Sequence, residues 1–187
     1  MSRRLAMLVA LALAAPSATV AQAPAPAVHP GTRLEFPGTL GPAQFARSFT
    51  YPIGRATAYR YNYVAGGMEI SVQLYDEGRR VPAGGDNPAV VNQFAEEMQG
   101  TDRSFRSSGF ANVDRPTVPS QCTYGTARFR CIVYTVSGQS GRLFSKMLLT
   151  GYRDQYLKIR IDWPQASRQT VADADKTLAA FIAALLR

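Results

Sequence analysis

The run from Gln121 to Trp163 constrains the fold more than any other stretch, because it reads as consecutive strands joined by short turns. Segments 128–136, 142–150 and 156–163 are rich in β-branched and aromatic residues. Pro164, which cannot donate a hydrogen bond to a strand ladder, ends the last of them. The pattern predicts a three-stranded antiparallel meander.

Side chains alternate between the two faces of a strand, so the apolar pattern predicts how these strands pair. The apolar residues of the third segment share one face: Leu157, Ile159, Ile161 and Trp163. Matching the second segment to this face places Leu143 opposite Trp163. In the same register Leu149 lies opposite Leu157, and this pairing requires an odd-numbered loop.

The other face of the predicted meander carries cations with aromatic residues between them. Its candidate ligand-binding residues are Arg128, Arg130, Tyr134, Lys146, Tyr156, Lys158 and Arg160. Lys146 lies across from Arg160 in this register, and like charges so placed cost a few tenths to about 1 kcal/mol. One interpretation is an anion-binding surface. The other is a solvated outer face, on which Lys and Arg stems cover Phe144 and Leu148.

The N-terminus has the three parts of a secretory signal peptide, which we expect to span residues 1–21. Arg3 and Arg4 precede an apolar run over 5–15, and small residues follow up to Ala21. The apolar run is too short to span a bilayer, and we expect no transmembrane segment after signal removal. The chain is therefore expected to be exported, either periplasmic in a bacterium or secreted.

The rest of the chain is expected to form a Pro/Ala-rich tether over 22–31 and a single domain over 32–187. We expect three further elements beside the meander. They are a hairpin that includes Tyr59, Tyr61 and Tyr63, a helix from Asn87 to Gly100, and a final helix capped by Ser167. The expected fold is α+β, with an antiparallel sheet of six or seven strands and two packed helices.

The net charge of the chain narrows the classes of binding partner that we expect. Loss of Arg3 and Arg4 lowers the formal charge from +8 to +6, which leaves the mature chain basic. Nucleic acid is not expected outside the cytoplasm. Anionic lipid, acidic polysaccharide or an acidic protein would suit this charge.

Cys122 and Cys131 are the two cysteines of the sequence. In an exported chain we expect them to form an intramolecular disulfide, because an oxidising compartment favours the bond. Two buried free thiols are the alternative.

The residue types argue against most catalytic chemistry. The single histidine, His29, lies in the expected tether, so neither a Ser/His/Asp site nor a histidine metal site is expected. No cofactor motif is present, and no cofactor or metal is predicted. Whether the protein is an enzyme stays open, although the pattern favours a non-catalytic domain.

Three pieces of the chain resemble a group of small exported bacterial proteins of unassigned function. They are 70–78, 148–153, and 157–160 followed by Pro164. The order of hairpin, helix, meander and terminal helix is also similar to PsbP-type domains, which are non-enzymatic accessory domains. That second resemblance implies a fold and carries no functional residues over.

Three functional hypotheses follow. The first is an exported non-catalytic domain that binds an anionic ligand or envelope component through the basic sheet face. The second is an accessory or assembly protein that docks a protein partner through the 76–85 loop and the tyrosine row, which is Tyr59, Tyr61 and Tyr63. The third is a hydrolase without histidine, which would depend on carboxylates alone.

Overall fold

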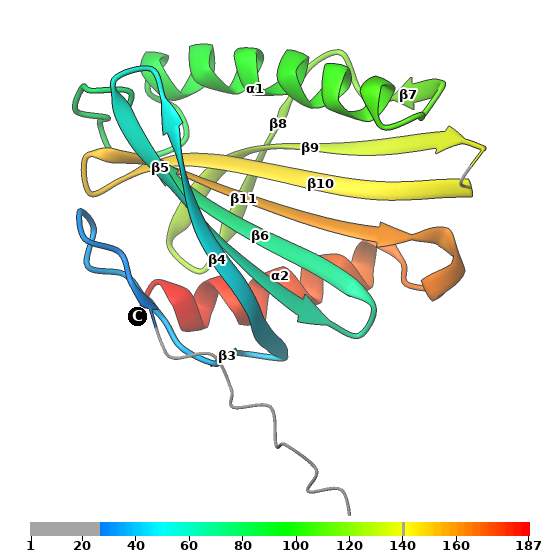
Figure 1. Ribbon diagram of the computed structural model, residues 1–187, viewed down its shortest axis with the longest axis horizontal. Helices are drawn as coiled ribbons and strands as arrows, with labels where there is room; N and C mark the ends of the chain where they lie inside the picture. Colours follow the sequence, from blue (N-terminus) through cyan, green and yellow to red (C-terminus); the bar gives the residue numbers. More distant parts are fainter. Residues whose placement is uncertain (1–26, 140) are drawn as a thin grey trace, which may run out of the picture.

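The computed structural model describes residues 27–139 and 141–187. The expected signal peptide and the first part of the expected tether, 22–26, lie outside these residues. The described chain forms a curled antiparallel sheet with one long helix on each face (Figure 1). The α+β fold class predicted from the sequence is confirmed.

The main sheet has nine strands within the described residues, in the order β3-β4-β5-β6-β11-β10-β9-β7, and β8 also pairs with β9. Its strands are β3 (Thr39–Leu40), β4 (Ala43–Ile53), β5 (Ala56–Ala65), β6 (Met68–Tyr75), β7 (Asn112–Asp114), β8 (Ser120–Tyr124), β9 (Ala127–Gly138), β10 (Gly141–Tyr152) and β11 (Gln155–Pro164). The sheet has more strands than the six or seven expected. One reason is that β4 is mostly exposed and shows no clear apolar alternation.

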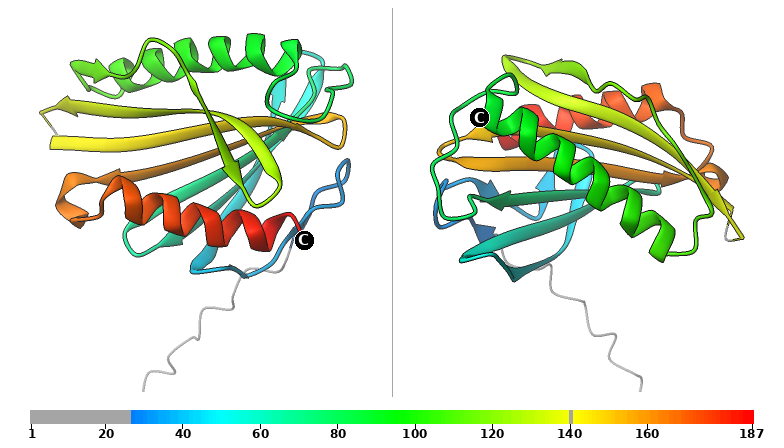
Figure 2. Two further views of the ribbon diagram at one scale, coloured as in Figure 1. Left: turned by 180° about the vertical axis from the view of Figure 1, so that it is seen from behind. Right: turned by 90° about the horizontal axis from the view of Figure 1, so that it is seen from above.

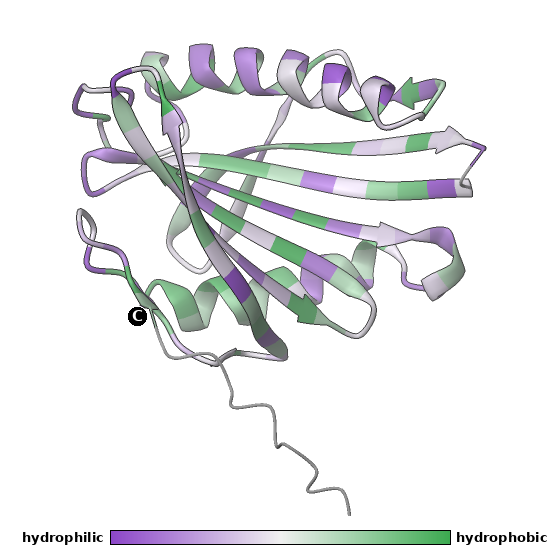
Figure 3. Cartoon of the chain, in the orientation of Figure 1, coloured by the Kyte–Doolittle hydropathy of each residue, from purple (hydrophilic) through white to green (hydrophobic). Residues whose placement is uncertain are grey.

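Both faces of the sheet are buried, each under one helix (Figure 2). Helix α2 (Val171–Leu185) packs on the predicted apolar face of β11, through Leu178, Phe181 and Leu185. Helix α1 (Pro88–Ser107) covers the opposite face and places Phe94 and Phe105 there. Figure 3 shows that hydrophobic and hydrophilic residues alternate along the strands. A charged residue in a central strand therefore needs a partner whichever way it points.

Helix α1 continues for two turns beyond Gly100, where the sequence predicts its end. Thr101 and Phe105 extend the buried stripe of the helix, and both are at least 95% buried. A helical glycine costs about 1 kcal/mol relative to alanine. Burying a phenylalanine side chain contributes about 1.5–3 kcal/mol, which outweighs that cost.

The final helix begins at Thr170 rather than at Ser167, which belongs to the short 3₁₀ helix η1 (Gln165–Ser167). The Thr170 hydroxyl accepts a hydrogen bond from the backbone N–H of Asp173, and the Asp173 carboxylate accepts one from the backbone N–H of Thr170. This reciprocal capping box satisfies two donors at the start of α2.

The predicted register between β10 and β11 is wrong by one residue. Leu148 lies opposite Ile159, and Phe144 lies opposite Trp163. The loop between these strands has two residues, Arg153 and Asp154, both with positive φ, so its length is even and not odd. Arg-Asp lacks the Asn-Gly signature of such turns. Every side chain of β10 therefore faces the side opposite to that predicted.

The expected tether is folded from residue 27 onwards. Strands β1 (Ala27–Val28) and β2 (Glu35–Phe36) form a small antiparallel hairpin. His29 is fully buried in it and packs edge-on against Tyr59, with ring centroids 4.6 Å apart. Its Nδ1 accepts a hydrogen bond of 2.9 Å from the backbone N–H of Thr32. This bond places the proton of the neutral ring on Nε2 and fixes the hairpin turn.

A disulfide joins Cys122 to Cys131, as predicted, with Cα atoms 6.1 Å apart. Closing this short loop contributes about 2–3 kcal/mol in the chain-entropy model. The bond accords with an oxidising compartment. Among the described residues, no helix is both long and apolar enough to cross a membrane.

Acid should weaken the fold through His29. Burial lowers the pKa of His29 from 6.5 to about 4, and the nearby charge of Asp76 opposes this shift. The folded state therefore favours the neutral ring, and its contribution is complete above pH 6.5 and lost as the pH falls toward 4. We expect His29 to account for a loss of about 3 kcal/mol between pH 7 and pH 4.

The measurement is urea unfolding of the wild type and His29→Asn at several pH values in this window. Asparagine keeps an acceptor near the Thr32 N–H but does not titrate, so its stability should depend less steeply on pH. Identical slopes for the two proteins would contradict the assignment.

Candidate functional site

The seven residues of the predicted basic face do not share one open surface. Ion pairs join Arg128 to Asp86, Lys146 to Asp175, Lys158 to Glu97, and Arg160 to Asp162. Arg130 is half-buried in β9 and has no ion pair among the described residues. Tyr134 and Tyr156 are fully buried. The one-residue shift in register also moves Lys146 to the face covered by α2.

Lys158 and Glu97 form an ion pair between the sheet and α1, with Nζ and Oε2 2.5 Å apart. Their side chains are only 11% and 17% exposed. Glu97 also accepts a hydrogen bond of 2.5 Å from the Tyr75 hydroxyl. Burial, followed by the charge of Glu97, raises the pKa of Tyr75. Lys158 is therefore committed to an internal network that attaches α1 to the sheet.

Arg160 is likewise held internally. Its Nε donates a hydrogen bond of 2.8 Å to Asp162, and its guanidinium lies 4.9 Å from the centre of the Phe105 ring. The contact is a cation–π interaction with α1. Arg160 thus also helps to dock the helix on the sheet.

Removing Glu97 should destabilise the protein strongly, because the charge of Lys158 would remain buried without its partner. We expect Glu97→Ala to lower the free energy of unfolding by about 3–5 kcal/mol. The double variant Glu97→Ala/Lys158→Met should recover much of this loss in urea unfolding. Arg80→Ala, which breaks an exposed pair with Asp154, is the control and should cost less than about 1 kcal/mol. A loss below 1 kcal/mol for Glu97→Ala would contradict the prediction.

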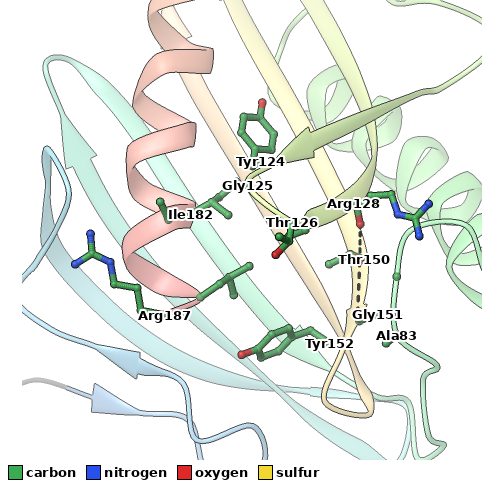
Figure 4. Close-up of a pocket in the computed structure, with 14 residues that line it drawn as sticks. Ala83, Tyr124, Gly125, Thr126, Arg128, Thr150, Gly151, Tyr152, Ile182 and Arg187 are labelled. Carbon is green, nitrogen blue, oxygen red and sulfur yellow. Dashed lines mark hydrogen bonds between the residues drawn. The ribbon is translucent and has the colours of Figure 1, made fainter.

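A pocket of about 570 Å³ lies between the end of α2 and the β8–β9 hairpin (Figure 4). We call it the α2 pocket. Tyr124 and Thr126 come from the hairpin, Tyr152 from the end of β10, Ile182 from α2, and Leu186 from its C-cap. These parts of the sequence are distant from one another, and the folded chain brings them together.

Lys146 supports one wall of the α2 pocket. It forms an ion pair with Asp175 of α2, and its ammonium lies 5.7 Å from the centre of the Tyr124 ring. The Tyr124 hydroxyl donates a hydrogen bond of 2.9 Å to the same Asp175 carboxylate. Burial, followed by this hydrogen bond, raises the pKa of Tyr124. The contacts fix the β8–β9 hairpin to the helix that forms the other wall.

The loop before α1 closes the pocket on the β10 side. Gly84 and Gly151 exchange backbone hydrogen bonds of 3.0 and 3.2 Å. A Cβ atom at Gly151 would lie 1.8 Å from the carbonyl oxygen of Pro82. Only glycine allows the loop to approach β10 this closely.

Gly151→Ala should therefore push the 82–84 loop away from β10 and disturb the pocket. We expect a loss of about 1–3 kcal/mol in urea or thermal unfolding, the usual cost of an overpacked site. Gly38→Ala is a matched control, because a Cβ at Gly38 meets no atom within 4 Å. Equal stabilities of the two variants would show that the close approach is unimportant.

The α2 pocket combines apolar walls with positive charge at its rim. Arg128 and Arg187 lie on two of its sides, and no acidic residue is among those that line it. Figure 4 shows both guanidinium groups directed away from the centre of the pocket. Arg128 lies 3.8 Å from Asp86, while Arg187 has no ion pair among the described residues. An apolar group suits the centre, and an anion suits the rim near Arg187.

A smaller hollow of about 260 Å³ lies on the other side of the last turn of α2, and we call it the arginine hollow. Arg33, Arg153, Arg187 and Glu35 supply its charged groups. Leu185 of α2 lines it, whereas Leu186, the residue directly after the helix, lines the α2 pocket. Arg187 is common to the linings of both cavities, which therefore lie next to each other.

The elements of the docking hypothesis are partly buried. Tyr61 and Tyr63 are at least 96% buried in the core under α2, and burial raises the pKa of Tyr61 to about 12. The 76–85 loop is attached to the β10–β11 turn through the bridge between Val81 and Asp154. Tyr61 and Tyr63 are thus part of the core, and Tyr59 is half-buried against it.

The described residues contain no group of three or more His, Cys, Asp or Glu side chains placed to hold a metal ion. No family model matches the chain, and a search of curated proteins found no match. The assignment of the site therefore depends on its geometry. The resemblances drawn from sequence stay predictions.

Proposed function

We propose that this protein is an exported, non-catalytic domain that binds an amphipathic anion in the α2 pocket. The observation that carries the proposal is the composition of the pocket: apolar and aromatic walls, arginines at the rim and no Asp or Glu in the lining. Its volume of about 570 Å³ is within the range of small-molecule sites. The basic sheet face is not part of the proposal, because internal ion pairs hold its cations.

The apolar lining favours one of the three anionic partner classes. Tyr124, Tyr152, Ile182 and Leu186 offer surface to a hydrocarbon chain, and each buried methylene contributes about 0.8 kcal/mol. An acidic polysaccharide has no such chain. A lipid-like anion, with an apolar part and one charged end, therefore matches the pocket better.

The lining also supports a binding role rather than catalysis. It provides hydroxyls from two threonines and two tyrosines, but no side-chain carboxylate, imidazole or thiol that could act as a base or nucleophile. Thr150 already donates a hydrogen bond of 2.8 Å to the carbonyl oxygen of Arg128, drawn in Figure 4. The carboxylate-only hydrolase has no residue pair in this pocket to support it.

Decanoate is a suitable first probe, measured by calorimetry with the mature protein. Octanoate should bind about tenfold more weakly than decanoate, because it buries two fewer methylenes. Decyltrimethylammonium, which has the same chain and the opposite charge, should bind more weakly still. Ala183→Trp should abolish binding of decanoate, because Ala183 is exposed and lines the pocket.

Ala172→Trp is the matched control, since Ala172 is exposed on the same helix and does not line the pocket. It should leave the affinity for decanoate unchanged. Equal affinities for the two chain lengths, or binding that survives Ala183→Trp, would rule out the α2 pocket as the site.

The accessory or assembly protein remains the second candidate, and β4 gives it a structural basis. Most of β4 beyond its pairing with β3 has no strand partner on its outer edge among the described residues, and Phe49 on it is 42% exposed. An open edge can accept a strand from another protein. Ala183→Trp distinguishes the candidates, because partner docking at β4 would survive that change.

A further inference from the structure

Three arginines of the arginine hollow have no ion pair among the described residues. Arg33, Arg153 and Arg187 come from the β1–β2 turn, the β10–β11 turn and the end of the chain after α2. None of them takes part in a salt bridge within the described chain, in contrast to Lys146, Lys158 and Arg160. Their charge is therefore available to a ligand.

The two turns that carry Arg33 and Arg153 are held in place before any ligand binds. Arg153 Nη1 donates a hydrogen bond of 2.5 Å to the carbonyl oxygen of Thr32 and so joins one turn to the other. The backbone N–H of Arg33 donates to the carbonyl oxygen of His29 at 2.9 Å. Both arginines have positive φ, 57° and 46°, a conformation that residues other than glycine seldom adopt. Such strain is often found where a side chain must be placed for function.

The three guanidinium groups of the hollow suit an anion with several oxygens. Glu35 and the main-chain carboxylate of Arg187 offset part of their positive charge. A phosphate monoester carries about 1.5 to 2 negative charges at neutral pH, and its oxygens match the forked N–H donors of guanidinium groups. A carboxylate has one charge and two oxygens, and would use the hollow less fully.

The position of the hollow connects it with the α2 pocket. Arg187 lines both cavities, and Tyr152 of the pocket precedes Arg153 of the hollow, with the Arg153 guanidinium 5.2 Å from the centre of the Tyr152 ring. In Figure 4 the Arg187 side chain points away from Tyr124, on the side where the β1–β2 segment lies. A ligand chain in the pocket can thus end at these arginines.

We propose that the ligand is a single-chain alkyl phosphate, with its chain in the α2 pocket and its phosphate in the arginine hollow. This inference rests on the proposed function and adds the identity of the head group. The competing explanation is that the arginines only balance the partial negative charge at the C-terminal end of α2. In that case they would not discriminate between anions.

The test compares decyl phosphate, decanoate and inorganic phosphate by calorimetry at pH 7.5 and low salt. Decyl phosphate should bind the wild type at least tenfold more tightly than decanoate. Arg33→Asn and Arg153→Asn should each weaken decyl phosphate about tenfold and decanoate by less than about threefold. Asparagine is chosen because it adopts positive φ readily, so each turn should keep its shape. Thermal unfolding of the variants checks this.

Arg106→Gln is the charge-matched control, because Arg106 is exposed on α1 and lines neither cavity. It should leave all three affinities unchanged. Equal binding of decyl phosphate and decanoate to the wild type, or equal losses for both ligands in the variants, would overturn the phosphate assignment and leave the proposed function intact. Inorganic phosphate that binds as tightly as decyl phosphate would show a free oxyanion site and overturn the alkyl phosphate. Failure of both decyl ligands to bind would overturn the proposed function as well.

Discussion

Burial of both faces of one sheet is the constraint on which the rest of this structure depends. Helices α1 and α2 cover opposite faces, so the side chains of β10 and β11 leave water whichever way they point. The desolvation of a charged group is costly unless a partner compensates it. Lys158 meets Glu97 of α1, and Lys146 meets Asp175 of α2. The central cations thereby attach helices to the sheet.

This constraint also decides where a ligand can bind. A surface whose charges are already paired offers little to an external anion, and the covered faces admit no ligand. The turns at one end of the sheet are different, because no helix within residues 27–139 and 141–187 covers them. The α2 pocket and the arginine hollow form there, where Tyr152 and Arg153 lie at the end of β10 and Arg187 follows α2. The proposed function therefore resides at the end of the sheet.

The conformations of the turns connect stability with the candidate site. His29 fixes the β1–β2 turn from within the core, and that turn presents Arg33 and the carbonyl oxygen that Arg153 binds. The close contact between Gly84 and Gly151 sets the loop beside the α2 pocket. The residues that shape the site are thus mostly buried or glycine. They would be difficult to identify by their chemistry alone.

Local patterns predicted a large part of the fold. The alternation in 156–163 gave the apolar face of β11 correctly, and the spacing of Cys122 and Cys131 gave the disulfide. Helix α2 packs on this face. The candidate site was not predicted, because Arg33, Arg153 and Arg187 are far apart in the sequence and share no local pattern.

The sequence by itself determined the fold class, the strands of the meander and the bond between its cysteines, because these follow from the periodicity and spacing of neighbouring residues. The tertiary structure decided the register of β10, which depends on whether a turn contains an even or odd number of residues. It also decided which cations are paired and which are available. Those properties arise from contacts between distant segments, such as Lys158 with Glu97 and Arg153 with Thr32, whose energies no local pattern records.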